Sequence, residues 1–243
     1  MRNDITKLVS GFITSKISGE EQGEFLNREL PLNNKNYTYQ LYVPPNAKTE
    51  NLPLMIFLHG IRERGSGGYI SGMFSSVIKQ YLKDIPAMIL FPQCRPSVYW
   101  SDPQMDKMVM RQIEAVKSEF AIDEKRKYLI GVSMGGYGVW SFASEYPKTF
   151  AALVSICGGS PLSNGNRFLP IAEKIGKTPA WLFHGSDDQV VQVSESRNLA
   201  AAIRENNGNV KYTEYEGVGH NVYLNAIGEK ELMPWILSQK IGE

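Results

Sequence analysis

One stretch of the sequence constrains the fold more than any other. The apolar run Tyr128 to Ile130 is followed by Gly-Val-Ser-Met-Gly at 131–135 and then by apolar residues at helical spacing. Glycine on both sides of Ser133 permits a strained turn between a strand and a helix. Such a turn lifts the Ser133 hydroxyl off the end of a sheet, where a base and a substrate can both reach it. We therefore interpret this stretch as a nucleophile elbow.

The length and charge of the chain narrow its organisation and its partners. The 243 residues suffice for the core of one α/β unit, and we predict a single domain over residues 1–243 with residues 1–24 as an N-terminal arm. The 26 basic and 25 acidic residues form no long run of one sign, so we expect no nucleic-acid partner. We also expect no membrane partner, because the longest apolar stretches are far too short to span a bilayer.

The start of the chain and its two cysteines bear on cellular location and metal binding. No sustained apolar segment and no small-residue cleavage site follow the first residues, so we expect a cytoplasmic protein, with a trimmed secreted chain as the alternative. Cys94 and Cys157 lie far apart and outside any Cys/His cluster, so we expect no disulfide framework and no metal site. Cys157 is interpreted as a small core residue at a strand end.

Apolar strands alternate with helical patterns along the sequence. The predicted strands cover residues 25–30, 37–43, 53–58, 87–91, 128–130, 151–156, 180–183 and 210–215, and the predicted helices cover 105–120, the segment after Ser133, 194–206 and 225–240. The first two strands flank a turn-rich segment and should pair as an antiparallel hairpin. The strand at 53–58 is continuously apolar, as in a parallel sheet covered on both faces. We therefore predict an α/β class protein with three layers, a mostly parallel central sheet and the N-terminal hairpin.

Polar residues collect where the predicted strands end. In a parallel sheet these carboxyl ends share one edge, and ligands bind there. The segments that follow successive strands are His59-Gly60, Pro92-Gln93-Cys94, the turn at Ser133, His184-Gly-Ser-Asp-Asp188 and Gly217-Val-Gly-His220. These residue types at one edge indicate a catalytic site.

A serine hydroxyl needs a neighbouring imidazole to take its proton, and the imidazole needs a carboxylate to orient it. His220 is the predicted base because it lies in a glycine-flanked loop after the last strand. Asp187 and Asp188 both lie in the right loop to be the acid, and successive residues cannot both point at one imidazole. We expect the remaining histidines, His59 and His184, to organise their loops through hydrogen bonds to the backbone.

The predicted reaction also requires an oxyanion hole, and the amides of Ile61 and Met134 are the candidates by position. The glycine-rich loop at 59–68 lacks both the Gly-Lys-Ser/Thr ending of a phosphate-binding loop and the spacing of a dinucleotide fingerprint. We therefore expect no cofactor. Arg62, with its charged neighbours, is interpreted as part of a local ion-pair network, and a grip on an acidic substrate is the alternative.

Five motifs occur in order and carry a family resemblance. They are His59-Gly-Ile-Arg-Glu-Arg-Gly65, Pro92-Gln-Cys94 with Trp100-Ser101, Gly131 to Gly138, His184-Gly-Ser-Asp-Asp188 and Lys211 to His220. From about Tyr37 to the C-terminus, the chain resembles the α/β-hydrolase esterases often labelled predicted peptidases. These are close to the phospholipase/carboxylesterase group and to feruloyl and acetylxylan esterases of the carbohydrate esterase 1 type.

The resemblance implies a role for each matching residue. It makes Asp188, rather than Asp187, the acid. It implies Ser133 as nucleophile, His220 as base, the Ile61 and Met134 amides as oxyanion hole, and Gln93 and Trp100 as lining of the acyl or leaving-group pocket. Aromatic Tyr137 is a further candidate for stacking on an acyl group or sugar. Many relatives have a second glycine where this chain has Arg62.

The function predicted from the sequence is that of a serine carboxylesterase acting on small soluble esters, with carbohydrate-linked acetyl or feruloyl esters as candidate substrates. The longest insertion between strands, around 161–176, is too short for a large lid domain. A peptidase or thioesterase with the same triad is the alternative within enzymes. A non-catalytic binding protein on a hydrolase scaffold is the alternative outside them, although such a protein would be expected to have lost a member of the triad. The oligomeric state stays open.

Overall fold

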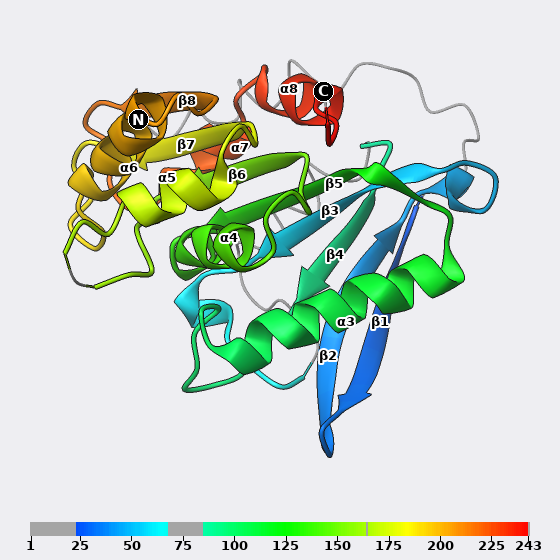
Figure 1. Cartoon of the computed structure of the whole chain (residues 1–243). Helices are drawn as coiled ribbons and strands as arrows, with labels where there is room; N and C mark the ends of the chain where they lie inside the picture. The colour runs from blue at the N-terminus through cyan, green and yellow to red at the C-terminus, as the bar shows by residue number, and fades with distance from the viewer. Residues whose placement is uncertain (1–22, 68–84, 164, 243) are drawn as a thin grey trace, which may run out of the picture.

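The computed structural model describes residues 23–67, 85–163 and 165–242. These residues form an eight-stranded sheet with helices on both faces (Figure 1). The strand order is β1-β2-β4-β3-β5-β6-β7-β8. Strand β2 pairs antiparallel with β1 and β4, and all other neighbours pair in parallel. The predicted three-layer α/β fold with an N-terminal antiparallel hairpin is confirmed.

The elements have the following bounds. The strands are β1 (Glu24–Leu32), β2 (Lys35–Val43), β3 (Leu52–Leu58), β4 (Met88–Pro92), β5 (Ile122–Val132), β6 (Ala152–Ile156), β7 (Ala180–Gly185) and β8 (Val210–Tyr215). The helices are α3 (Pro103–Glu119), α4 (Met134–Glu145), α5 (Leu169–Ile175), α6 (Ser194–Glu205), α7 (Tyr223–Ile227) and α8 (Leu232–Ser238), with short 3-10 turns η1 (Pro45–Lys48) and η2 (Ile61–Glu63). Apart from its last two residues, the predicted arm at 1–24 lies outside the described residues.

Three elements differ from the sequence prediction. Strand β5 starts at Ile122 rather than near Tyr128, and its polar first half is exposed or half-buried and carries ion pairs such as Arg126–Asp123 at 2.7 Å. Helix α5 lies within the segment predicted as an insertion. The predicted helix at 225–240 is two helices, with Pro234 in the first turn of α8. Proline is tolerated there because first-turn amides have no intrahelical acceptor.

The sheet divides the core into two apolar clusters, because successive side chains of a strand point to opposite faces. On β3, Leu54, Ile56 and Leu58 join the cluster under α3, α4, α5 and α6. Met55 and Phe57 join the other cluster, which α7 and α8 cover (Figure 1). All seven residues of β3 are buried, which explains its continuous apolar sequence.

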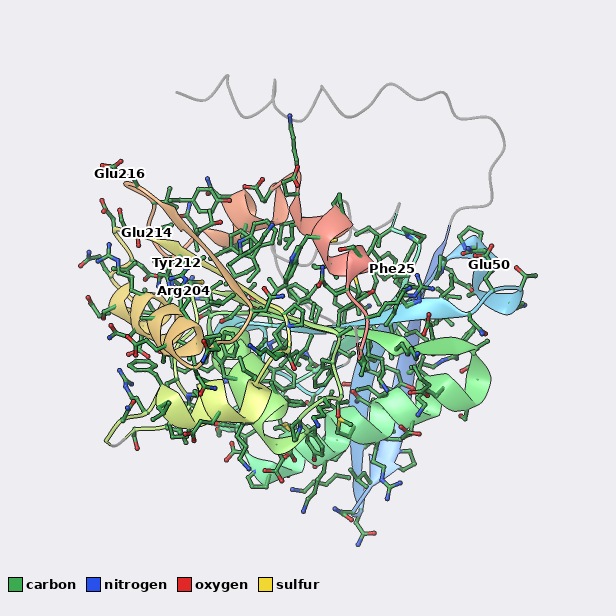
Figure 2. All side chains as sticks on the ribbon, turned by 45° about the horizontal axis from the view of Figure 1, so that its top comes forward. Phe25, Glu50, Arg204, Tyr212, Glu214 and Glu216 are labelled. Carbon is green, nitrogen blue, oxygen red and sulfur yellow. The ribbon has the colours of Figure 1, made fainter. Side chains whose placement is uncertain are left out.

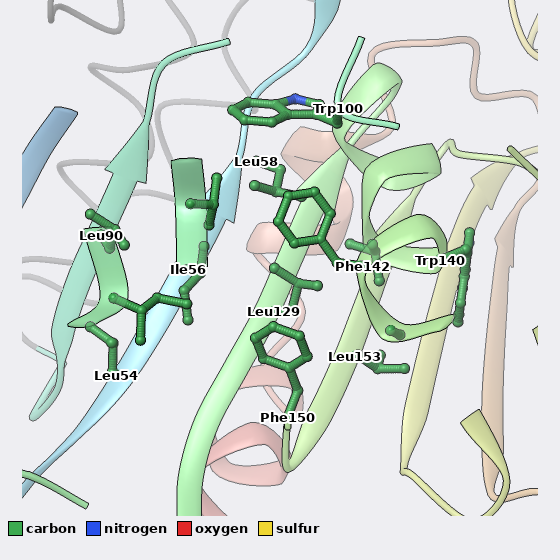
Figure 3. Close-up of a cluster of buried hydrophobic side chains, with 14 of the residues drawn as sticks. Leu54, Ile56, Leu58, Leu90, Trp100, Leu129, Trp140, Phe142, Phe150 and Leu153 are labelled. Carbon is green, nitrogen blue, oxygen red and sulfur yellow. The ribbon is translucent and has the colours of Figure 1, made fainter. Parts of the chain in front are cut away.

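The first cluster fixes the helix that follows the elbow. Figure 3 shows Leu58 of β3 and Leu129 of β5 in this cluster together with Phe142 and Trp140 of α4. All four side chains have 0% of their surface exposed. The position of α4, and with it the turn at Ser133, therefore depends on this packing.

Truncating Phe142 tests that dependence. We expect Phe142→Ala to lower the free energy of unfolding by about 3–5 kcal/mol, because it removes buried area and leaves a cavity. Urea denaturation followed by circular dichroism measures the change. Val190→Ala is the control, because Val190 is 71% exposed and its truncation should change stability by about 0.5 kcal/mol or less. Equal losses in the two variants would contradict the assignment of Phe142 to the core.

Candidate active site

The turn between β5 and α4 holds Ser133 in an uncommon backbone conformation. Its φ is 54° and its ψ is −117°, a region that costs free energy for any residue with a side chain. Hydrogen bonds hold this conformation: the Ser133 amide donates to the carbonyl of Ile156 at 2.8 Å, and its carbonyl accepts from the amide of Tyr137 at 3.2 Å. The side chain is thereby lifted off the sheet edge.

The two glycines of the turn allow a close backbone approach. A Cβ at Gly131 would lie 2.1 Å from the carbonyl oxygen of Gly135, and a Cβ at Gly135 would lie 1.9 Å from that of Leu58. Both distances are far below van der Waals contact, and the neighbouring atoms belong to the backbone. The G-x-S-x-G pattern is therefore required by sterics at these two positions.

Three side chains from three loops form a continuous hydrogen-bonded chain. The Oγ of Ser133, after β5, lies 2.9 Å from Nε2 of His220, which follows β8. The Nδ1 of His220 lies 2.7 Å from Oδ2 of Asp188, which follows β7. The His220 side chain keeps 27% of its surface exposed, whereas that of Asp188 has none. This arrangement allows the imidazole to accept the serine proton while the carboxylate orients the ring.

The Asp188 carboxylate is held by several donors. Its Oδ1 accepts from the backbone amides of Val190 at 2.8 Å and Val191 at 2.9 Å. Its Oδ2 accepts from His220 and also lies 3.3 Å from Nε2 of His184. Burial by itself raises the pKa of Asp188, but the bonds from Val191, His220 and Val190 outweigh burial and lower it. The group is therefore a carboxylate near neutral pH.

Asp187 points elsewhere. It is exposed, and its Oδ1 accepts from the hydroxyl of Ser186 at 2.7 Å. Figure 2 shows Glu214 and Glu216 at the edge of the molecule formed by β8, near Arg204 of α6. A shallow surface pocket of about 610 Å³ lies there, lined by Ser186, Asp187, Arg197, Glu214, Glu216 and Gly217. This pocket is not lined by Ser133, Asp188 or His220. Asp187 and Asp188 therefore face different parts of the molecule.

The two predicted oxyanion amides begin helical turns. Ile61 is the first residue of η2 and Met134 is the first residue of α4. First-turn amides have no intrahelical acceptor, so these N–H groups are free to donate to a ligand. The side chain of Ile61 is 41% exposed and that of Met134 is 7% exposed.

His59 organises the loop that carries Ile61. It is fully buried, its Nδ1 donates to the carbonyl of Gly60 at 2.7 Å, and its Nε2 accepts from the amide of Cys94 at 3.0 Å. Burial lowers the pKa of His59 to about 4, so the ring is neutral near pH 7. His184 is likewise bonded to a backbone carbonyl, that of Val191. The predicted hydrogen bonds of both histidines to the backbone are confirmed.

The predicted pocket residues lie in different environments. The prediction that Trp100 lines the pocket is wrong: its side chain is 0% exposed, packs against Gly138 and His59, and donates from Nε1 to the carbonyl of His59 at 2.9 Å. Gln93 is 5% exposed, and its Nε2 donates to the carbonyl of Glu63 at 3.3 Å. Tyr137 is half-buried, one helical turn after Ser133.

Cys157 lies closer to the site than its sequence position indicates. Its thiol, the Asp188 carboxylate and the His220 imidazole each offer a potential metal ligand, all within 4.8 Å of one another. Burial raises the pKa of the Cys157 thiol to about 12, so the thiol stays protonated. Asp188 and His220 are already bonded to each other, and this geometry fits a hydrogen-bonded triad better than a metal centre.

The loop after β6 adds residues that the sequence reasoning did not identify. Glu195 of α6 is nearly buried, accepts from the amide of Ser160 at 3.1 Å and forms an ion pair with Arg167. A Cβ at Gly159 would lie 2.9 Å from the ring of Tyr137. Glu195 thus ties this loop to α6 beside the first turn of α4. No motif links these residues, because they lie far apart in the sequence.

A family comparison agrees with this geometry. The protein family described as Phospholipase/Carboxylesterase matches residues 96–229, which is more than half of the chain and includes all three members of the hydrogen-bonded chain. The chain belongs to the phospholipase/carboxylesterase family. Its fold is therefore the α/β-hydrolase fold of that family.

Individual relatives are more distant. The chain is 24% identical over 235 residues to poly(3-hydroxyalkanoate) depolymerase C of Paucimonas lemoignei, covering 76% of this chain and 53% of the relative. It is 25% identical over 134 residues to an acetyl esterase of Caldicellulosiruptor saccharolyticus, covering 52% and 47%. The chain thus spans about half the length of these curated relatives. The crystal structure of a thermostable esterase superposes with a TM-score of 0.78 at 33% identity, covering 89% of this chain and 63% of that one.

The lengths and polarity of the helices bear on whether one of them could span a membrane. Within residues 23–67, 85–163 and 165–242, each helix is too short or too polar to cross a bilayer.

The buried neutral state of His59 predicts a pH-dependent stability. Because the folded pKa of about 4 lies below the ordinary value of 6.5, the unfolded chain binds the proton more readily. The contribution of His59 is fully present above pH 6.5 and falls by about 3 kcal/mol as the pH drops to 4. Urea denaturation of wild type and His59→Asn measures it: the stability advantage of the wild type should shrink over this range. An advantage independent of pH would contradict a neutral buried ring.

Proposed function

We propose that the protein is a serine carboxylesterase that hydrolyses small esters through an acyl-enzyme, within a single catalytic domain. The observation that carries the proposal is the hydrogen-bonded chain Ser133–His220–Asp188, with distances of 2.9 and 2.7 Å. These three side chains lie at the edge of the sheet, near the amides of Ile61 and Met134, which begin η2 and α4. This combination supplies a nucleophile, a base, an orienting carboxylate and donors for an oxyanion.

In the first half-reaction, the Oγ of Ser133 attacks the ester carbonyl as Nε2 of His220 takes its proton. The carbonyl oxygen becomes an oxyanion that accepts hydrogen bonds from the amides of Ile61 and Met134. The Asp188 carboxylate stabilises the resulting imidazolium through Nδ1. The imidazolium then protonates the leaving alcohol, and the acyl group stays on Ser133.

In the second half-reaction, His220 takes a proton from water, which attacks the acyl-enzyme carbonyl. The tetrahedral intermediate uses the same two amides. Its collapse returns the proton to Ser133 and releases the carboxylic acid. No step requires a group beyond these residues and water.

The proposed substrates are compact esters, with acetyl or feruloyl groups linked to carbohydrate as candidates. The acetyl group is supported as a candidate because one relative is named an acetyl esterase. The ring of Tyr137, one turn from Ser133, offers an aromatic surface for the second. Among the described residues between β6 and β7, the one helix is the seven-residue α5, which offers little cover for a bulky lipid chain.

The same triad would serve a peptidase or a thioesterase, because these reactions pass through similar tetrahedral intermediates. A panel of acetyl, butyryl, feruloyl, thioester and peptide substrates separates the alternatives. We expect the highest kcat/KM on an oxygen ester. A peptide or thioester hydrolysed faster than every oxygen ester would reassign the reaction.

A fluorophosphonate probe tests the nucleophile. We expect covalent labelling of the wild type, because the probe traps a serine oxygen activated by a base. Ser133→Ala should neither react with the probe nor hydrolyse p-nitrophenyl acetate. Gel fluorescence and mass spectrometry of the labelled peptide give the readout. An unlabelled wild type, or labelling that survives Ser133→Ala, would refute the proposed enzyme.

Replacing the two adjacent aspartates tests the acid. Asp188→Asn should lower kcat on p-nitrophenyl acetate by about 10³–10⁴-fold, because the amide cannot stabilise the imidazolium and favours the wrong tautomer. Asp187→Asn is the matched control and should keep most of the activity, since its side chain is exposed and bonds Ser186. The reverse order would assign the acid to Asp187.

A further inference from the structure

The acid of the proposed triad contacts a second histidine. We propose that His184 is a positioning residue that holds Asp188 against His220, an inference that rests on the proposed function. His184 does not reach Ser133 in this scheme. It acts through the loop that joins β7 to α6.

The hydrogen bonds of His184 define its tautomer. Its Nε2 lies 2.9 Å from the carbonyl oxygen of Val191, and a carbonyl can only accept, so Nε2 carries the proton. Its Nδ1 lies 2.7 Å from the hydroxyl of Ser196 in α6, which therefore donates to it. The ring is fully buried, and α6 fixes its orientation.

This ring closes the loop around the carboxylate. Val191 donates its amide to Oδ1 of Asp188 at 2.9 Å and accepts from His184 through its carbonyl. The same Nε2 lies 3.3 Å from Oδ2 of Asp188, the oxygen that His220 contacts at 2.7 Å. One carboxylate oxygen thus lies between two imidazole nitrogens. Without His184, the carbonyl of Val191 loses its hydrogen-bond donor, and the Val191 amide is held less firmly against Asp188. The carboxylate is then freer to rotate away from His220.

The charge state of His184 suits this role. Burial lowers its pKa, so the ring is neutral at the pH where an esterase would work. A neutral ring donates a hydrogen bond without placing a second positive charge beside the imidazolium that forms on His220. The other titratable groups that act on this cluster include Asp188, Glu214, Cys157 and Tyr137.

Three variants on one network test the proposal. His184→Leu removes the donor, His184→Gln keeps a side-chain N–H close to the position of Nε2, and Ser196→Ala removes the hydroxyl that orients the ring. Leu199→Ala, one turn further along α6, is the control for lost stability because Leu199 is fully buried and lies outside the network. Fluorophosphonate titration counts active sites, so that kcat is expressed per labelled Ser133.

We expect His184→Leu to lower kcat on p-nitrophenyl acetate by about 10–100-fold, the loss typical at metal sites when the hydrogen-bond partner that orients a ligating side chain is removed. KM should change by less than about threefold, because His184 does not contact the substrate in this scheme. The acidic limb of kcat/KM should move to lower pH, because a carboxylate that is less well held stabilises the protonated base less. His184→Gln should recover most of the kcat and the wild-type limb, and Ser196→Ala should give an intermediate kcat.

The outcomes separate this inference from the proposed function. A wild type that is neither labelled nor active refutes the function itself. An active wild type with an unchanged limb and unchanged kcat per labelled site in His184→Leu overturns the positioning role. The same shift of the limb in Leu199→Ala also overturns it, because the shift would then follow from lost stability alone.

Discussion

The close packing of the elbow backbone against the ends of β3 and β6 is the constraint on which the rest of the site depends. Ser133 adopts a positive φ, which costs on the order of 1–3 kcal/mol for a residue with a side chain. The cost is offset by surrounding contacts: its amide bonds Ile156, and Gly135 lies against the carbonyl of Leu58. Those contacts require three neighbouring parallel strands that end at the same level. The sheet and its two apolar layers therefore supply the rigidity that the turn needs.

Elements with a strong apolar pattern could be predicted from the sequence, and those with a weak one could not. β3, β4, β6 and β7 are buried on both faces, so their continuous apolar runs identified them. The first half of β5 escaped prediction because it is partly exposed and held by ion pairs. Helix α5 escaped prediction because it has seven residues, which is too short for a helical pattern to stand out. Its buried side chains are those of Ile171, Ala172 and Ile175.

The side chains of the candidate active site show a similar division. Ser133, Asp188 and His220 could be placed at one sheet edge because each follows a strand, and the structure brings them within hydrogen-bonding distance. The distinction between Asp187 and Asp188 needed either a family resemblance or coordinates, because it depends on which side chain turns inward. Trp100 shows the converse limit: an aromatic residue in a loop beside the site has no mark in the sequence that separates pocket wall from core.

The thiol beneath the site gives the fold a chemical selectivity. Cys157 and Ser133 end adjacent parallel strands, and a thiol is intrinsically the better nucleophile of the two. Yet burial raises the pKa of the Cys157 thiol to about 12, while the Ser133 hydroxyl faces the imidazole of His220. Two potential nucleophiles therefore lie side by side. The buried thiol donates to the backbone carbonyl of His220 at 3.8 Å, whereas the partly exposed hydroxyl lies 2.9 Å from the imidazole nitrogen of His220. In the proposed mechanism, access to the base, rather than the intrinsic nucleophilicity of sulfur over oxygen, decides which atom carries the acyl group.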